Sequence, residues 1–231
     1  MNGAAIVAGW RIGVSRLWQT VVFAAAAGAI LLGVVMALME RHSDLVGATG
    51  RVLEGPVFGW LVPFVSLFGA IRVLGGRRLD QTAAVAARFG YSRRAVAFGL
   101  VLVNMVMAGV LSAALASVAV VVAHDPAASP SMLRDALTTA WIAALASYAY
   151  CGMFAFGSMF GSRGGGRLVC LAIDLLVGGS HNVLAVVLPH GHAINLLGGD
   201  ATFCVGQPAS VLALVLLGSL FAAVALLRCA R

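Results

Sequence analysis

The stretch AVAFGLVLVNMVMAGVLSAALASVAVVVA, residues 95–123, contains no charged residue. Asn104 and two serines are its only strongly polar side chains, and the rest are apolar or small. A helix needs about 20 predominantly apolar residues to cross the hydrocarbon core of a bilayer. This stretch is long enough to do so, and it predicts a transmembrane helix.

Five further stretches meet the same condition, so we predict an all-α membrane protein with six transmembrane helices in a single domain over residues 1–231. The six predicted spans cover residues 21–39, 56–76, 95–123, 136–162, 168–188 and 209–227. The first is interpreted as a span and not a signal peptide, because Glu40 and Arg41 end it where a cleavage site would need small residues.

The composition agrees with this interpretation and excludes some chemistry. Of 231 residues, 61% are apolar and only 10% are charged, against about 25% charged in average soluble domains. All 15 basic residues are arginine. Without lysine the chain has neither a P-loop for ATP nor a Schiff-base amine. Cys151, Cys170, Cys204 and Cys229 show neither metal-site nor disulfide-framework spacing.

The placement of charge predicts the orientation. With six spans, every arginine except Arg41, Arg51 and Arg134 falls on one side of the membrane. Cytoplasmic loops carry an excess of basic residues, so that side and both termini are predicted to be cytoplasmic. The opposite side carries most of the acidic residues, namely Glu40, Asp44, Glu54, Asp125, Asp135 and Asp200.

The cytoplasmic segment between the second and third spans predicts a short helix over residues 80–89. Asp80 is a suitable N-cap, Gly90 a suitable stop, and Val85 and Phe89 form an apolar stripe. Two interpretations stay open from the residues alone: a helix lying among lipid headgroups, or a docking element for a cytoplasmic partner. The spacing of Trp10, Val14, Leu17 and Trp18 predicts a second interfacial helix at the N-terminus.

Together, these features resemble the permease subunits of type-2 ABC exporters. The run Arg88-Phe89-Gly90-Tyr91-Ser92-Arg93-Arg94 is similar to the segment that leads into the third span in that family. The stretch at residues 189–199, beginning Pro189-His190-Gly191-His192, is similar to the outer segment between its fifth and sixth spans. The likeness covers nearly the whole chain.

The resemblance implies a permease in the bacterial inner (plasma) membrane that dimerises, with itself or a related chain, and pairs with a separate ATP-binding cassette ATPase. The partner would hold ATP and Mg, and this chain would carry no cofactor and no catalytic residue. The substrate path would lie between two permease copies. The ATPase-coupling residues would be Asp80, Val85, Phe89, Tyr91, Arg93 and Arg94, with Arg77 and Arg78 also flanking the dock.

Four polar residues fall inside the predicted spans: Asn104, Asp174, His181 and Asn182. Ionisable residues in lipid mark functional sites or buried pairs. We expect Asp174 to form either a structural ion pair, for example with Arg167 seven residues earlier, or a helix-packing bond, and a transport role is the alternative. Asn104 is expected to bond between helices.

Two competing classes remain. A secondary transporter would use Asp174 and His181, although no inverted repeat is evident. A rhomboid-like intramembrane serine protease would use Ser158 in the fourth span with a histidine. It is disfavoured because Ser158 is predicted near the cytoplasmic side and His190 and His192 outside. Those two histidines, with Asp200 and Cys204 some way off, are a weak signal for a metal site.

Overall fold

The computed structural model describes residues 3–127, 129–179, 183–199 and 205–229, and these form helices and no β-strand. In chain order the helices are α1 (Gly3–Leu17), α2 (Thr20–Ser43), α3 (Ala48–Val52), the π-helix η1 (Leu53–Leu61), α4 (Val62–Leu74), α5 (Leu79–Ala87), α6 (Arg93–Ala123), α7 (Met132–Gly157), α8 (Gly166–Val177), the 3-10 helix η2 (Val183–Val187), α9 (Pro189–Leu196) and α10 (Gln207–Arg228).

Five helical segments among the described residues are long and apolar enough to cross a membrane: Thr20–Ser43, Ala48–Ala87, Arg93–Ala123, Met132–Gly157 and Gln207–Arg228. The second of these contains α3, η1 and α4, which follow one another without a break as far as Leu74. The molecule is therefore an all-helical chain compatible with a multi-pass membrane protein.

The predicted span at residues 168–188 has a different structure. Its first part forms α8, which has 12 residues and is about 18 Å long, too short to cross a 30 Å hydrocarbon core. The chain continues through η2 to the short helix α9. Gly178 and Gly179 follow α8 directly, and a side chain at Gly178 would collide with the Cβ of His190. The division of this segment thus brings α9 against the end of α8.

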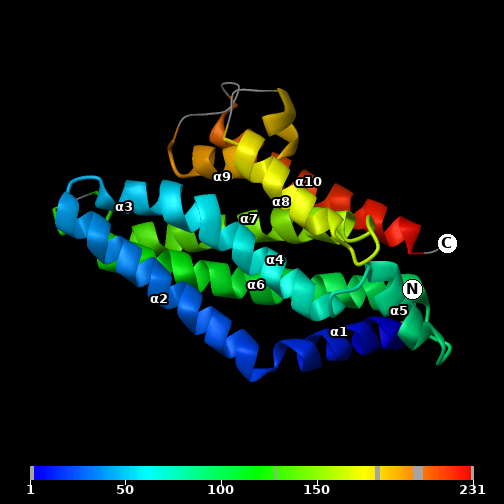
Figure 1. Cartoon of the computed structure of the whole chain (residues 1–231). Helices are drawn as coiled ribbons and strands as arrows, with labels where there is room; N and C mark the ends of the chain where they lie inside the picture. The colour runs from blue at the N-terminus through cyan, green and yellow to red at the C-terminus, as the bar shows by residue number, and fades with distance from the viewer. Residues whose placement is uncertain (1–2, 128, 180–182, 200–204, 230–231) are drawn as a thin grey trace.

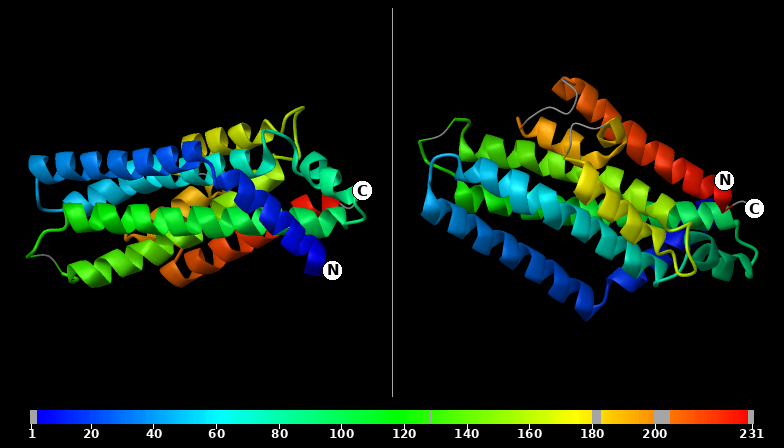
Figure 2. Two further views of the ribbon diagram at one scale, coloured as in Figure 1. Left: turned by 90° about the horizontal axis from the view of Figure 1, so that it is seen from below. Right: turned by 45° about the horizontal axis from the view of Figure 1, so that its top comes forward.

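Helix α6 lies at the centre of the molecule and contacts α1, α2, α4, α5 and α7. Figure 1 shows α6 and α7 side by side, with the α3–α4 rod along them and α8 and α9 on the outside of α7. Helix α2 diverges from this body towards the elbow that joins it to α1, as Figure 1 and the right view of Figure 2 show.

Small residues let neighbouring helix backbones touch at two places. A Cβ at Gly9 of α1 would collide with the carbonyl of Val96 in α6. A Cβ at Gly152 of α7 would collide with the backbone of Gly218 in α10. Close backbone approach through small residues is a common way for helices to associate in lipid. Helices α1 and α10 are held to the central pair in this way.

Three buried serines link the central helices. The hydroxyl of Ser147 in α7 donates to Ser112 Oγ in α6 at 2.7 Å, and it lies 3.1 Å from Ser66 Oγ in α4. Ser66 also bonds to the carbonyl of Val62 at 3.0 Å. Each hydroxyl has a partner, so the polar groups stabilise the contact and cost little on burial.

Helix α1 packs against α6 mainly through small residues. Its buried positions are Ala5, Gly9, Gly13 and Leu17, four residues apart, and they contact α6. Of the predicted aromatic stripe, Trp18 is 70% exposed and Trp10 is only half-buried. Three of the four buried positions hold small residues, which let α6 approach α1 to backbone contact.

The first and last helices meet at one end of the molecule. A buried apolar cluster at this end includes Ala5 of α1, Leu79 of α5, Val96 of α6 and Ala225 of α10. Figure 1 shows the two chain ends and α5 together there. We call it the basic end. The turns between α2 and α3 and between α6 and α7 lie at the opposite end, which we call the acidic end.

Replacing Gly152 with valine should force α7 and α10 apart, because the new Cβ would meet the backbone of Gly218. We expect a loss of about 3 kcal/mol of stability, at the upper end for overpacked cores. Thermal denaturation in detergent, followed by size-exclusion chromatography, measures it. The control is Gly28→Val, since Gly28 is a helical glycine of α2 with open space around it. Equal stability of the two variants would contradict the proposed helix contact.

Candidate functional site

Helix α5 is anchored at the basic end through one face. Leu79 and Ala83 are fully buried, and the hydroxyl of Thr82 donates to the carbonyl of Leu74 at 2.9 Å, at the end of α4. The predicted N-cap is wrong: the helix begins at Leu79 after Arg78, and Asp80 lies in its first turn. Asp80 instead pairs with Arg78, whose Nε lies 3.1 Å from its Oδ1. This carboxylate favours the helix start through the helix dipole.

The opposite face of α5 carries exposed apolar side chains. Val85 is 48% exposed, and Phe89, just beyond the helix end, is 79% exposed. The turn that follows contains Gly90 in the left-handed region, with φ of 82°, and then Tyr91, which is also exposed. Arg93 and Arg94 are exposed at the start of α6. The coupling residues proposed from the sequence are thus gathered on and just after one short helix.

A cleft of about 670 Å³ lies beside α5. One wall is a face of the helix that includes Val85 and Arg88, and the others are formed by the Gly75–Arg77 turn and by Arg163. No described residue forms an ion pair with any of the three arginines that line the cleft. Burial, and secondarily the charge of Arg77, lower the pKa of the nearby Arg16 guanidinium. The cleft is therefore a strongly positive environment that favours anionic groups.

At the acidic end, Arg51 pairs with two carboxylates. Arg51 Nε lies 2.9 Å from Glu40 Oε2, and Arg51 Nη1 lies 3.6 Å from Asp44 Oδ2. Arg41 donates to the carbonyl of Val122 at 2.9 Å, which ties α2 to the end of α6. At the basic end, by contrast, Arg77, Arg88 and Arg163 have no ion-pair partner among the described residues.

Arg167 does not pair with Asp174, so the expected ion pair is wrong. Its guanidinium is buried and donates to four carbonyl oxygens, at distances of 2.9 to 3.2 Å. These belong to Gly164, Ala70, Arg77 and Arg163. Carbonyls near the end of α4 and in the loop before α8 supply enough acceptors to satisfy the cation without a carboxylate.

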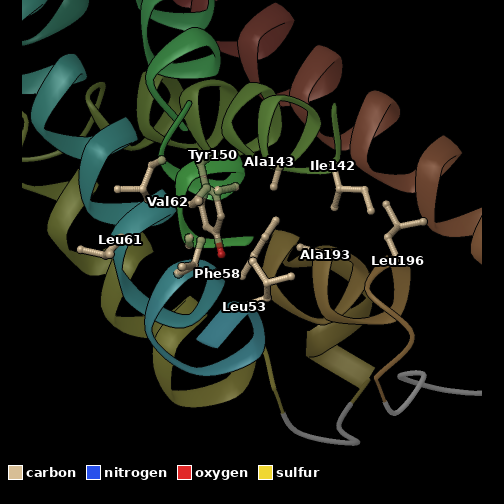
Figure 3. Close-up of a cluster of buried hydrophobic side chains, with 14 of the residues drawn as sticks. Leu53, Phe58, Leu61, Val62, Ile142, Ala143, Tyr150, Ala193 and Leu196 are labelled. Atoms are coloured by element: carbon tan, nitrogen blue, oxygen red, sulfur yellow. The ribbon is translucent and has the colours of Figure 1, made fainter. Parts of the chain in front are cut away.

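Asp174 lies fully buried in α8 and bonds to two other elements. The hydroxyl of Tyr150 in α7 donates to Asp174 Oδ2 at 2.7 Å, and the backbone N–H of His190 donates to Oδ1 at 3.3 Å. Figure 3 shows Tyr150 inside the apolar cluster, near Phe58 of η1 and Ala193 of α9. The carboxylate therefore connects α7, α8 and the start of α9. His181 and Asn182, expected nearby, lie outside the described residues.

A second polar cluster lies next to it, between α9 and α10. The ring of His192 bonds to Ser210 Oγ at 3.2 Å and to the carbonyl of Val186 at 2.9 Å. Asn195 Nδ2 donates to Ser210 Oγ at 2.8 Å and to the carbonyl of Val205 at 2.7 Å. Sequence reasoning missed Asn195 and Ser210, because a single polar residue in an apolar stretch does not identify its partner.

The structure also places the residues predicted for a metal site, for a protease and for a bond between helices. No three His, Cys, Asp or Glu side chains gather as a metal site within the part of the chain that the structure describes. Ser158, proposed for a protease, donates to the carbonyl of Ala155 in its own helix at 2.6 Å. Asn104 Nδ2 donates to Cys151 Sγ in α7 at 3.1 Å, in agreement with the expected bond between helices.

Comparison with known proteins identifies no relative. No protein family, curated protein or solved structure matches the chain.

Replacing Arg167 with leucine should remove a donor from four carbonyls, of which those of Gly164 and Ala70 accept buried bonds. Because hydrogen bonds from a charged group contribute about 1.5–3 kcal/mol each and are not additive, we expect a total loss of about 3 kcal/mol or more. Thermal denaturation in detergent again measures it. Arg163→Leu is the matched control, since Arg163 is exposed in the same loop. A stable Arg167→Leu protein would show that these bonds contribute little.

Proposed function

We propose that this chain is the transmembrane permease subunit of an ATP-driven exporter in the bacterial inner membrane, and that it works as a dimer with a separate ATPase. The proposal includes a cytoplasmic location for both termini and for α5, and counts the α8–α9 segment as the fifth of six membrane segments. ATP-driven closure of the ATPase would push α5 and shift the spans between inward-open and outward-open arrangements. No residue of this chain would bind ATP or Mg.

The two-sided arrangement of α5 carries the proposal. A helix that transmits force must be fixed firmly to the membrane helices on one face and must offer a contact surface on the other. Leu79 and Ala83 meet the first requirement through burial, and Val85 and Phe89 meet the second through exposure. A lipid-facing interfacial helix would also expose apolar side chains. The adjoining cleft with Arg77 and Arg88 favours an acidic protein surface as the partner.

The interface is tested by Phe89→Asp. The chain is co-expressed with a P-loop ATPase encoded beside its gene, and the complex is purified. We expect the variant to lower ATPase turnover in the complex at least about tenfold, since a charged group would replace an apolar anchor at the centre of the contact. The native chain should co-purify with the ATPase.

Val46→Asp is the control, because Val46 is 73% exposed at the acidic end and far from the proposed contact. It should leave both co-purification and turnover unchanged. The absence of any ATPase that binds the native chain would overturn the proposal, as would normal turnover with Phe89→Asp.

Asp174 supports a second candidate, an ion-coupled transporter. Discontinuous helices with buried charged groups are typical binding sites in secondary transporters. Here a buried carboxylate lies near the end of α8, where the chain leaves the helix, and bonds to the N-terminal turn of α9. This arrangement does not require a second protein.

Asp174→Asn separates the two candidates. If the chain is a proton-coupled transporter, the native protein alone in vesicles should show uptake driven by a pH gradient, and the variant should abolish it. Asn195→Asp, a polar change in the neighbouring cluster, controls for general disturbance of α9. Uptake by the native chain alone would favour this second function, whereas none, together with ATPase binding, would exclude it.

A further inference from the structure

The cleft beside α5 is built from three separate segments of the chain, and each of them contributes one arginine. Arg77 comes from the turn after α4, Arg88 from the end of α5, and Arg163 from the loop between α7 and α8. Figure 1 shows that loop next to α5 at the basic end. Arg163 lies far along the chain from α5, so no local sequence pattern connects it with that helix.

A buried arginine fixes the position of the loop that carries Arg163. One guanidinium nitrogen of Arg167, Nη2, donates to the backbone carbonyls of both Arg77 and Arg163, at 3.2 and 3.1 Å. Gly164 lies in the left-handed region, with φ of 70°, and a Cβ there would lie 2.8 Å from Arg167 Nη2 and 3.2 Å from the carbonyl oxygen of Arg77. A side chain at this position would push the loop away, so glycine lets it approach the turn after α4.

This arrangement holds like charges near one another without a counterion. Three guanidinium groups line one cleft, and no described residue forms an ion pair with any of them. The one carboxylate of α5, that of Asp80, pairs with Arg78 instead. Like charges repel one another, and a cleft lined by one sign of charge concentrates the field inside it. A group with more than one negative charge would remove this repulsion on entering the cleft.

The neighbouring side chains indicate what kind of anion this is. Val85 lines the cleft, and Phe89 is exposed just beyond the end of α5. Arginine and aromatic side chains together are typical of the residues that contribute most to protein–protein binding. The phosphodiester of a single phospholipid headgroup carries one negative charge, fewer than three arginines can pair with. A protein surface with several neighbouring carboxylates fits both the charge and the apolar rim.

We propose that Arg163 extends the docking surface of α5 to the loop between α7 and α8, and that the three arginines of the cleft bind neighbouring carboxylates of the ATPase. This contact rests on the proposed exporter function and adds to it a second cytoplasmic segment and the chemistry of the partner's surface. Arg167 also bonds to the carbonyl of Ala70 in α4. Force on the loop therefore reaches α4 and α8 together.

A single lysine can report on this contact, because the native chain contains none. The full-length Arg163→Lys chain is co-purified with the ATPase encoded beside its gene. The complex is treated with a carbodiimide, which joins an amine to a touching carboxylate through an amide bond. We expect mass spectrometry to find position 163 joined to an aspartate or glutamate of the ATPase. Arg134→Lys, the matched change at an exposed arginine of the acidic end, should give no such product.

Binding strength provides an independent measurement. Arg163→Glu should raise the Kd of the ATPase for the full-length chain in nanodiscs at least about tenfold, because repulsion replaces charge complementarity. Arg134→Glu makes the same change of charge and should leave the Kd within about twofold of the native value. Since Arg163 is exposed, both variants should unfold at the native temperature.

The outcomes separate this contact from the exporter function itself. An ATPase that binds the native chain but does not cross-link to Arg163→Lys, or that binds Arg163→Glu as tightly, would overturn the contact alone. If Arg163→Glu instead loses bound phosphatidylglycerol while it retains the ATPase, the cleft is a lipid site and the contact is likewise wrong. The absence of any ATPase that binds the native chain would overturn both.

Discussion

The whole arrangement depends on direct contact between helix backbones where side chains are absent. Within a bilayer, burying apolar side chains against one another gains little, because lipid tails are equally apolar. Close van der Waals contact and hydrogen bonds must therefore hold the helices. Gly9 against Val96, and Gly152 against Gly218, bring α1 and α10 onto the central pair of helices. The serine network of Ser66, Ser112 and Ser147 then adds directional bonds between α4, α6 and α7.

This packing determines the two faces of α5. Because α1, α6 and α10 converge at the basic end, they form a compact apolar cluster against which Leu79 and Ala83 can be buried. The short helix is thereby held with its other side outward, and its orientation follows from contacts made far along the chain. Arg167 adds to this by joining the end of α4 to the loop before α8 through carbonyl oxygens. The same end of the molecule is consequently both well packed and rich in unpaired positive charge.

Much of the helical architecture could be predicted from hydrophobic stretches, since these reflect a lipid environment directly. The stretch at 95–123, for example, is found within α6. The predictions that failed concern residues that had more than one possible bonding partner. Asp80 is a good cap in isolation, but the chain begins its helix one residue earlier and pairs that carboxylate with Arg78. Helical spacing placed Arg167 and Asp174 on one face and so predicted an ion pair. It could not show that carbonyl oxygens in and just after α4 would accept the hydrogen bonds of Arg167 instead.

The segment at 168–188 shows a further limit of hydropathy. Its composition is apolar enough for a span, but the pair Gly178-Gly179 and the bonds of Asp174 to Tyr150 and His190 favour a break. Those partners come from other parts of the chain, so no local pattern contains them. Asn104 is the opposite case. A polar residue in an apolar span predicts a bond to another helix, and Asn104 forms one to α7. The groove that lies beside Asn104, between α2 and the helices α4 and α6, was not predictable, because it depends on how far α2 diverges from α4 and α6.

The brevity of α8 has a consequence for how the protein is made. A helix of 12 residues with a buried carboxylate near its end is too short to cross a bilayer and depends on contacts with other helices. The partner of Asp174 in α7 is already present when α8 is made, but the N–H of His190 and the supporting helix α10 emerge only later. The contacts that hold α8 and α9 are therefore complete only when α10, a helix of 22 residues, has been made. Truncation before α10 would therefore also remove the helix against which α9 packs.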